Sequence, residues 1–269
     1  MSFIPIIGKI VMVKQSINLA YGFLFLIVIV SACSERERVK GIDGQVLRVD
    51  SVQMAVIDTD IDSLISIYRL PLEEEMNRVL AYSAQVMRKG TPEDLLNNFI
   101  ADLVLEHGRR LYQPDDGMQI DFCVLNYGGL RTTIPKGPVT VSGIYELMPF
   151  DNEMVVLTIT PENTLDLLGY IASRSTGTPI AGIRLGIRDR KVAGVSIEGQ
   201  PFDSGRPYKI LTSDYLAAAG DNMAFFLEPI NYELIGMRIR DAIILHLEEQ
   251  QQAGIMITSQ LDGRLYYAE

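Results

Sequence analysis

Apolar residues recur at a helical spacing in several parts of the chain. One stripe, formed by Leu95, Phe99 and Leu103, follows Thr91-Pro92, which offers an N-cap and a proline suited to the first helical position. The same signals predict three more helices, at Asp60–Val79 in two pieces with Pro71 starting the second, from Thr160-Pro161 through Ile171, and at Met237–Glu249.

Short apolar runs between these helices predict β-strands. The predicted strands are 120–125, 154–159, 208–211 and a hairpin formed by 183–187 and 192–197. Because strands and helices mix without strict β-α-β alternation, the pattern favours a mixed sheet. We therefore predict one domain of the α/β class, with an α+β-like mixture of elements.

The N-terminal region has the pattern of a targeting signal. Lys9 and Lys14 precede an apolar run at 20–30 that is short for a membrane span, and the run ends in V-S-A-C at Cys33. This is the pattern of a bacterial lipobox, which predicts a signal peptide over 1–32 and lipid attachment at Cys33. The alternative is an N-terminal membrane anchor that is never cleaved.

A lipidated Cys33 has consequences for the rest of the chain. We expect a tether over 33–45, a folded domain over 46–269, and a lipid-anchored protein on the periplasmic or surface face of a bacterial cell envelope. Translation could start at Met1 or at Met12, since both leave a usable signal. Cys123 is then the one remaining cysteine, so no intrachain disulfide is expected.

The charge balance limits the partners. The sequence has 24 Lys and Arg against 34 Asp and Glu, a formal net charge of −10. Such a surface disfavours binding to nucleic-acid backbones. An anionic ligand would need a local cluster of arginine side chains and backbone N–H groups.

The segment N-Y-G-G-L-R, from Asn126 to Arg131, can form such a cluster. A buried strand delivers Asn126 to its end, and Gly128-Gly129 allow a sharp turn and a close approach of the backbone to a ligand. Arg131 offers a planar charged fork for phosphate or ribose oxygens. The alternative interpretation is a glycine turn followed by a surface arginine.

Two aromatic residues lie in segments that could complete a ligand site. Phe150 belongs to P-F-D-N, and Tyr215 begins Y-L-A-A-A-G-D, which ends at Asp221. Two rings can sandwich a base, with stacking of about 1–3 kcal/mol per base in nucleic-acid systems, and a carboxylate can accept from both ribose hydroxyls. Taken singly, each ring is more often part of a hydrophobic core.

Together these blocks resemble the C-terminal domain of the 5′-nucleotidase family, which includes UDP-sugar hydrolases and 2′,3′-cyclic phosphodiesterases. The family pattern is N-G-G-G-(I/L)-R, G-P-(I/V)-T, P-F-x-N and (F/Y)-L-x-x-G-G-D, preceded by a P-E-S-x-L-G-N-x-x-A-D helix. The similarity runs from about Val46 to the C-terminus. It implies a layered α/β/β/α fold.

The resemblance also implies roles for individual residues. Phe150 and Tyr215 would sandwich the base, and Asn126 would hydrogen-bond it. Asp221 would hold the ribose hydroxyls, Arg131 would face the ribose and phosphate, and Arg88 is the nearest candidate for a further family arginine. The chain departs from the family pattern at three positions, where Tyr127, Asn97 and Ala219 each stand in place of a glycine.

Family members that cleave phosphate carry a separate metallophosphatase domain with two divalent metals, held in part by D-x-H and G-N-H-(D/E) blocks. This sequence has His107 and His246, and neither lies in such a block. We interpret both as structural, and no G-x-S-x-G nucleophile elbow is present. We therefore expect no catalytic residue, metal ligand or cofactor in this chain.

The resulting hypothesis is the substrate-binding half of a split 5′-nucleotidase. A separate metallophosphatase chain would carry the divalent metal pair, and this chain would be inactive alone. One alternative is a lipoprotein that binds nucleosides without turnover. Another is a degenerate relative whose pocket binds nothing.

Overall fold

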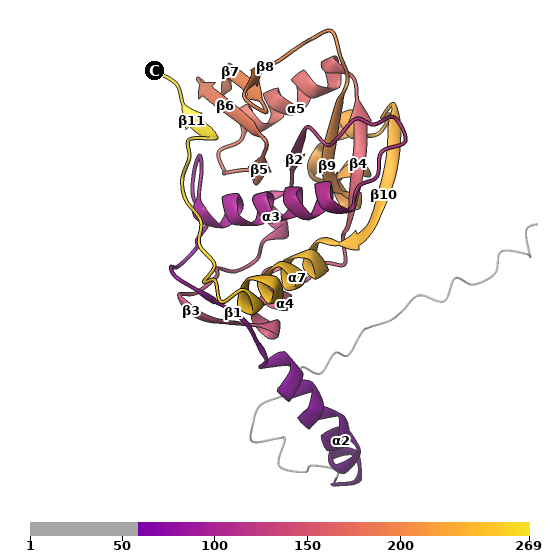
Figure 1. The fold of residues 1–269 in the computed structure, drawn as a ribbon, viewed down its shortest axis with the longest axis vertical. Helices are drawn as coiled ribbons and strands as arrows, with labels where there is room; N and C mark the ends of the chain where they lie inside the picture. Colours follow the sequence, from indigo (N-terminus) through magenta and orange to yellow (C-terminus); the bar gives the residue numbers. More distant parts are fainter. Residues whose placement is uncertain (1–58) are drawn as a thin grey trace, which may run out of the picture. The chain divides into compact units, whose positions relative to one another are not determined.

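The computed structural model describes residues 59–269 (Figure 1). The predicted signal peptide, the lipid attachment at Cys33 and the tether over 33–45 lie outside the described residues, as do the first residues of the predicted domain. None of the helices between residues 59 and 269 combines the length and the apolar character needed to cross a bilayer.

Helices and strands follow one another throughout this region. The helices are α2 (Thr59–Met76), α3 (Leu95–Leu111), α4 (Val141–Leu147), α5 (Pro161–Ser173), α6 (Asp214–Ala217) and α7 (Ile239–Gln252), with short 3-10 turns η2 (Tyr127–Gly129), η3 (Gly220–Asn222) and η4 (Ala224–Phe226). The strands are β1 (Val79–Ser83), β2 (Phe122–Val124), β3 (Gly137–Thr140), β4 (Glu153–Ile159), β5 (Ile180–Ala181), β6 (Ile183–Arg188), β7 (Lys191–Ile197), β8 (Gln200–Pro201), β9 (Tyr208–Ser213), β10 (Asn231–Arg238) and β11 (Leu265–Tyr267).

A five-stranded sheet forms the centre of the fold, in the order β10-β4-β9-β2-β5. Strands β2 and β9 are parallel, whereas the other neighbours in this sheet are antiparallel. A four-stranded sheet, β11-β6-β7-β8, and the β1-β3 pair complete the strands. The predicted mixed α/β class and the β6-β7 hairpin are therefore confirmed.

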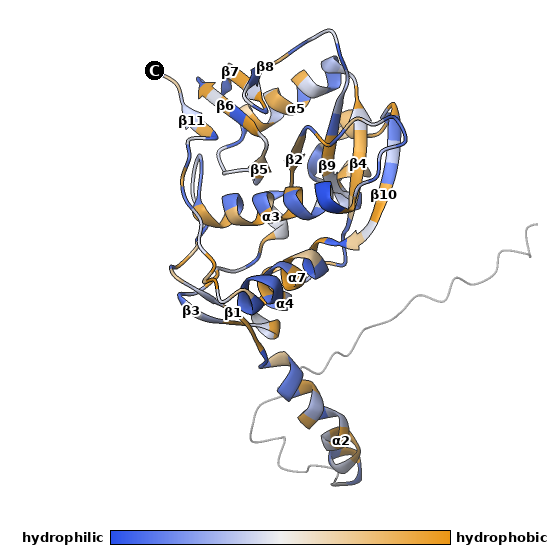
Figure 2. Cartoon of the chain, in the orientation of Figure 1, coloured by the Kyte–Doolittle hydropathy of each residue, from blue (hydrophilic) through white to orange (hydrophobic). Residues whose placement is uncertain are grey.

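The side chains of β4 point alternately into two hydrophobic cores, one on each face of the central sheet. Met154 and Val156 pack into the core formed with α3, α4 and α7, whereas Val155 and Leu157 point into the core formed with α5 and the β6-β7 hairpin. All four side chains are fully buried, and Figure 2 shows β4 as hydrophobic along most of its length. Side chains that alternate between the faces of a strand thus attach helices to both faces of the central sheet.

Several predicted boundaries are wrong, among them the end of the first helix, which lies at Met76 instead of Val79 because Val79 begins β1. The helix predicted to begin at Thr91-Pro92 begins at Leu95, because the Asp94 carboxylate is the cap and accepts the Asn97 N–H at 2.7 Å. Helix α2 continues through Pro71, where only one backbone N–H is missing. Residues 237–238 belong to β10, an edge strand whose partly exposed side chains give a weak apolar signal.

Candidate functional site

Most of the predicted site residues line one cavity of about 230 Å³. Three segments build it: the turn after β2, the loop before β4, and the α6-η3 region. The lining residues are Asn126, Gly128, Arg131, Phe150, Asn152, Tyr215 and Asp221. Asn152, the last residue of the P-F-D-N block, is the one lining residue for which the sequence predicts no role. The structure thus gathers groups that are separated by up to about ninety residues in the sequence.

The turn after β2 presents Asn126 and Arg131. Gly129 is buried behind Asn126, and a Cβ atom at this position would lie 2.7 Å from Asn126 Oδ1. The glycine therefore leaves room for the Asn126 amide. Arg131 is exposed and makes only a long bond, 3.4 Å from Nη1 to the Gly128 carbonyl, so most of its donors remain available to a ligand.

Tyr215 and Asp221 hold one another in a fixed arrangement. The Tyr215 hydroxyl donates to Asp221 Oδ1 at 2.9 Å and accepts the Asp221 N–H at 3.2 Å. The hydrogen bond to the carboxylate raises the pKa of Tyr215, so the phenol stays protonated and remains a donor. Gly220 is required between them, since a Cβ there would lie 2.5 Å from the Tyr215 ring.

The backbone around Asp221 adopts left-handed conformations. Ala219 has φ +63°, Asp221 +53° and Asn222 +63°. Asp and Asn tolerate this region, whereas alanine is strained there by about 1 kcal/mol. The Tyr170 hydroxyl donates to the Asp221 carbonyl at 2.9 Å and supports the turn. The Ala219 departure from the family glycine is therefore accommodated, at a cost in stability.

Phe150 is presented on a loop that Arg240 holds in place. The buried Arg240 guanidinium donates to the carbonyls of Met148 and Phe150, each at 3.2 Å, and pairs with the Asp151 carboxylate. Phe150 is 42% exposed and Tyr215 43% exposed. Neither ring is a core plug, so both remain available for stacking. The sequence did not predict a role for Arg240. The available sign was its charge, since it stands near the start of a predicted helix with an apolar face.

The prediction that Arg88 belongs to the site is not supported by the structure, in which Arg88 is not among the residues that line the cavity. Its neighbour Lys89 contacts Tyr127 in the turn after β2 instead. Lys89 Nζ donates to the Tyr127 carbonyl at 2.7 Å and lies 4.0 Å from the centre of the Tyr127 ring. Burial, and then the charge of Arg131, lower the pKa of Lys89. Tyr127, another departure from the family glycine, thus gains a basic partner.

Two carboxylates of the P-E…N-N…A-D block, those of Glu93 and Asp102, hold the fold together. Glu93 accepts the backbone N–H groups of Asp262 and Gly263 at 2.9 and 3.0 Å. Asp102 pairs with Arg264 at 2.6 Å. These carboxylates fasten the C-terminal segment to the start and middle of α3, and none of them lines the candidate site.

Potential metal ligands in residues 59–269 lie elsewhere. The only group of His, Cys, Asp and Glu there that could hold an ion is His107, His246 and Glu249, and none of the three lines the cavity. The interpretation of the two histidines as separate structural residues did not anticipate that α3 and α7 bring their rings to 5.6 Å.

Solved structures of nucleotidases share this fold. The 5′-nucleotidase precursor of Thermus thermophilus superposes with a TM-score of 0.64 at 23% identity, over 81% of this chain and 45% of that one. The NAD nucleotidase of Haemophilus influenzae gives a TM-score of 0.59 at 16% identity, over 79% and 42%. The fold is therefore of the 5′-nucleotidase type.

Residues 75–228 match the family described as 5′-nucleotidase, C-terminal domain. The chain belongs to this family. It is similar to the cell wall protein Lmo0130 of Listeria monocytogenes, 26% identical over 65% of this chain and 24% of that protein, and to a 5′-nucleotidase of Vibrio vulnificus, 31% identical over 38% and 19%. The chain thus spans about a quarter or less of these relatives.

Proposed function

We propose that this domain binds a nucleoside or nucleotide and is the substrate-binding half of a 5′-nucleotidase or UDP-sugar hydrolase. The observation that supports this most is the shared cavity, where Phe150, Tyr215 and Asp221 meet Asn126 and Arg131. Two half-exposed rings, one amide, one carboxylate and one free guanidinium are the groups that a base, a ribose and a phosphate require. The family membership agrees with this assignment.

The size of the cavity indicates which part of a nucleotide it holds. At about 230 Å³ it is below the roughly 300 Å³ at which sites for drug-sized ligands begin. It is therefore small for a whole nucleotide, and we propose that it takes the nucleoside and leaves the phosphate at the opening. Arg131 is exposed there, where its fork can hold a phosphate oxygen without enclosing the phosphate.

In this proposal the domain contributes positioning rather than bond cleavage. Tyr215 fixes one oxygen of Asp221 at 2.9 Å and leaves the other oxygen for ribose hydroxyls, so Asp221 is a binding group and not a general base. A divalent metal pair on a separate metallophosphatase chain would supply the nucleophilic water and stabilise charge at the phosphate. Holding the phosphate in a fixed position beside such a pair lowers the entropic part of the barrier.

We place the protein in a bacterial cell envelope, attached by lipid at Cys33. The lipobox pattern at the N-terminus supports this location, and one similar protein is named as a cell wall protein. The base preference is left open in this proposal, since both rings stack with any base.

The alternative is a lipoprotein that binds nucleosides without turnover. The same cavity would serve both roles, so binding alone does not separate them. A metallophosphatase gene beside this one favours the split enzyme, because a substrate-binding half must meet its metal-bearing half. A gene that stands apart from any metallophosphatase favours the binder.

The test has two stages. Calorimetry with the full-length protein, adenosine and AMP measures binding, and Asp221→Ala serves as the defective variant. Hydrolysis of AMP is then measured with the protein alone and with the neighbouring metallophosphatase, in Mn²⁺, Co²⁺ or Zn²⁺. We expect hydrolysis only from the mixture. Vigorous AMP hydrolysis by this chain alone would contradict the split arrangement, and an absence of nucleoside binding would contradict both candidate functions.

A further inference from the structure

A group of potential metal ligands lies between α3 and α7, outside the nucleoside cavity. His107 is fully buried on α3, His246 is 9% exposed on α7, and one donor atom from each, with one from Glu249, lie within 4.8 Å of one another. His107 Nε2 and Glu249 Oε2 are 3.8 Å apart. The spacing is that of side chains that can share one ion.

Both imidazoles have a buried nitrogen without a hydrogen-bond partner. These atoms are Nε2 of His107 and Nδ1 of His246. A buried polar atom without a partner costs free energy, so such atoms are uncommon in folded proteins unless an ion or water completes them. Two of them on neighbouring rings, whose centres are 5.6 Å apart, beside a carboxylate, fit a shared partner such as an ion.

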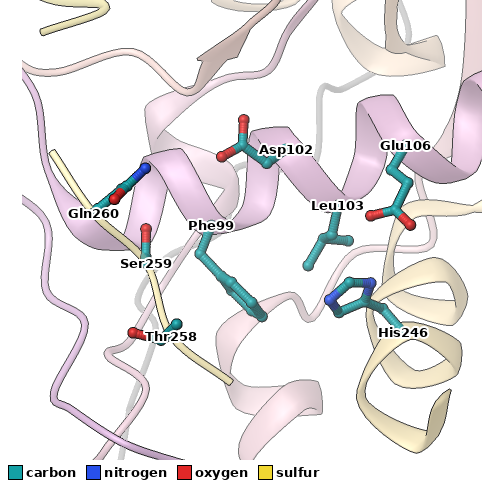
Figure 3. Close-up of a pocket in the computed structure, with 8 residues that line it drawn as sticks. All are labelled: Phe99, Asp102, Leu103, Glu106, His246, Thr258, Ser259 and Gln260. Carbon is teal, nitrogen blue, oxygen red and sulfur yellow. The ribbon is translucent and has the colours of Figure 1, made fainter. Parts of the chain in front are cut away.

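A cavity of about 450 Å³ lies beside the group and is lined by one of the three residues, His246. His246 forms part of its wall, and Glu106 from α3 and His246 from α7 point toward one another across it (Figure 3). Asp102 also lines this cavity. The cavity thus brings a second carboxylate, that of Glu106, to the solvent-facing side of His246.

We propose that His107, His246 and Glu249 form a binding site for one divalent transition-metal ion such as Zn²⁺. Two imidazoles and one carboxylate are a usual three-ligand set for zinc, with water in the fourth position. Imidazole ligands also suit Co²⁺ and Ni²⁺, whereas Mg²⁺ and Ca²⁺ prefer oxygen ligands. The bound ion would join α3 to α7.

The ionisation of the three groups agrees with this assignment. Burial lowers the pKa of both imidazoles, so each ring is neutral near pH 7 and carries one lone pair. The hydrogen bond from Arg110 lowers the pKa of Glu249, which is a carboxylate.

Arg110 is the competitor for this site. Its Nη2 lies 2.7 Å from His107 Nδ1 and its guanidinium pairs with Glu249 at 2.9 Å. Because a guanidinium only donates, Nδ1 of a neutral His107 accepts and Nε2 carries the proton in the metal-free protein. Metal binding at Nε2 requires that proton to move to Nδ1 by exchange with solvent and Arg110 to turn away, which its 45% exposed side chain permits.

The experiment uses the full-length protein, prepared without a histidine tag and freed of metal by chelation. Zn²⁺ alone is titrated by calorimetry, and Co²⁺ alone is followed by its visible absorption. We expect one saturable equivalent per chain for the native protein and at least tenfold weaker binding for His246→Ala and Glu249→Gln. Arg110→Met should bind several-fold more tightly, because the competing charge is removed.

Glu248→Gln is the matched control. Glu248 is the neighbour of Glu249 on α7 and also pairs with an arginine, Arg78, at 2.8 Å, but it is not part of the ligand group. Its variant should bind Zn²⁺ like the native protein. Because Glu249 is partly exposed, we expect Glu249→Gln to fold. This variant therefore tests the site even if a histidine variant unfolds. No saturable binding by the native protein, or unchanged binding by Glu249→Gln, would overturn the proposal.

Discussion

Replacing Asp221 with alanine should weaken nucleoside binding at least tenfold. One carboxylate oxygen is already bonded to the Tyr215 hydroxyl at 2.9 Å, so the other oxygen is the group left for ribose hydroxyls. Hydrogen bonds to charged groups contribute about 1.5–3 kcal/mol. Asp221 is only half-buried, which places the expected loss at the low end of that range, and about 1.4 kcal/mol corresponds to a factor of ten in affinity.

The substitution also affects the backbone, and a matched control separates the two effects. Asp189, in the turn between β6 and β7, has φ +50°, close to the +53° of Asp221, but it does not line the cavity. Alanine at either position introduces similar left-handed strain, up to about 1 kcal/mol. Both variants should therefore lose stability in thermal unfolding, Asp221→Ala somewhat more because it also loses the hydrogen bond from Tyr215, whereas only Asp221→Ala should lose affinity.

Calorimetry with adenosine measures the affinities, and circular dichroism on heating measures the stabilities. Asp221→Asn should lie between the native protein and Asp221→Ala, because the amide keeps an acceptor without the charge. Affinity of Asp221→Ala within twofold of the native value would remove Asp221 from the site. An equal loss of affinity in Asp189→Ala would show that strain, rather than the carboxylate, is responsible.

Three further predictions concern strain, phosphate recognition and acid stability. Ala219→Gly should raise the free energy of unfolding by up to about 1 kcal/mol, because glycine adopts φ +63° without strain, as measured by denaturant titration. Arg131→Gln should weaken AMP binding about tenfold but adenosine binding less than twofold, because only AMP presents a phosphate to the fork, as measured by calorimetry. The Lys209 ammonium, which bonds Asp116 at 2.6 Å, holds the pKa of that carboxyl below its usual 3.8, so the contribution of this pair is present above about pH 4 and is lost as the pH falls through the lowered value. Unfolding of Asp116→Asn followed across acid pH should therefore show a shallower loss of stability than unfolding of the native protein.

Each of these predictions has an outcome that contradicts it. A destabilised Ala219→Gly would mean that the flexibility gained by the unfolded chain outweighs the strain relieved. Equal losses for AMP and adenosine in Arg131→Gln would mean that Arg131 shapes the cavity and does not bind phosphate. Identical acid profiles for the native protein and Asp116→Asn would show that the ion pair is screened by solvent.

Much of the central fold could be predicted from the order of apolar residues. The buried strands β4 and β9, the β6-β7 hairpin and helix α5 with its Thr160 cap all follow from local patterns. The edge strand β10 was missed because its exposed positions carry no apolar alternation. The cap of α3 was misplaced, since both Thr91 and Asp94 are good capping residues and only the backbone geometry chooses Asp94.

The sequence by itself also determined the chemical groups of the candidate site. Asn126, Arg131, Phe150, Tyr215 and Asp221 stood in recognisable blocks, and the structure gathers them in one cavity. The sequence could not show which of two adjacent basic residues, Arg88 or Lys89, contacts the turn after β2. Lys89 rather than Arg88 reaches Tyr127, which depends on how the loop after β1 packs against the turn after β2.

Contacts between distant elements were decided only by the tertiary structure. Arg240 fixes the loop that carries Phe150 across ninety residues of sequence, and the packing of α3 on α7 brings His107 beside His246. A local sequence pattern depends on a residue and its near neighbours in the chain. These contacts form only when the packing of the hydrophobic cores brings distant helices and loops together. The nucleoside groups could thus be predicted from the sequence, but their mutual support and the histidine pair depend on long-range packing.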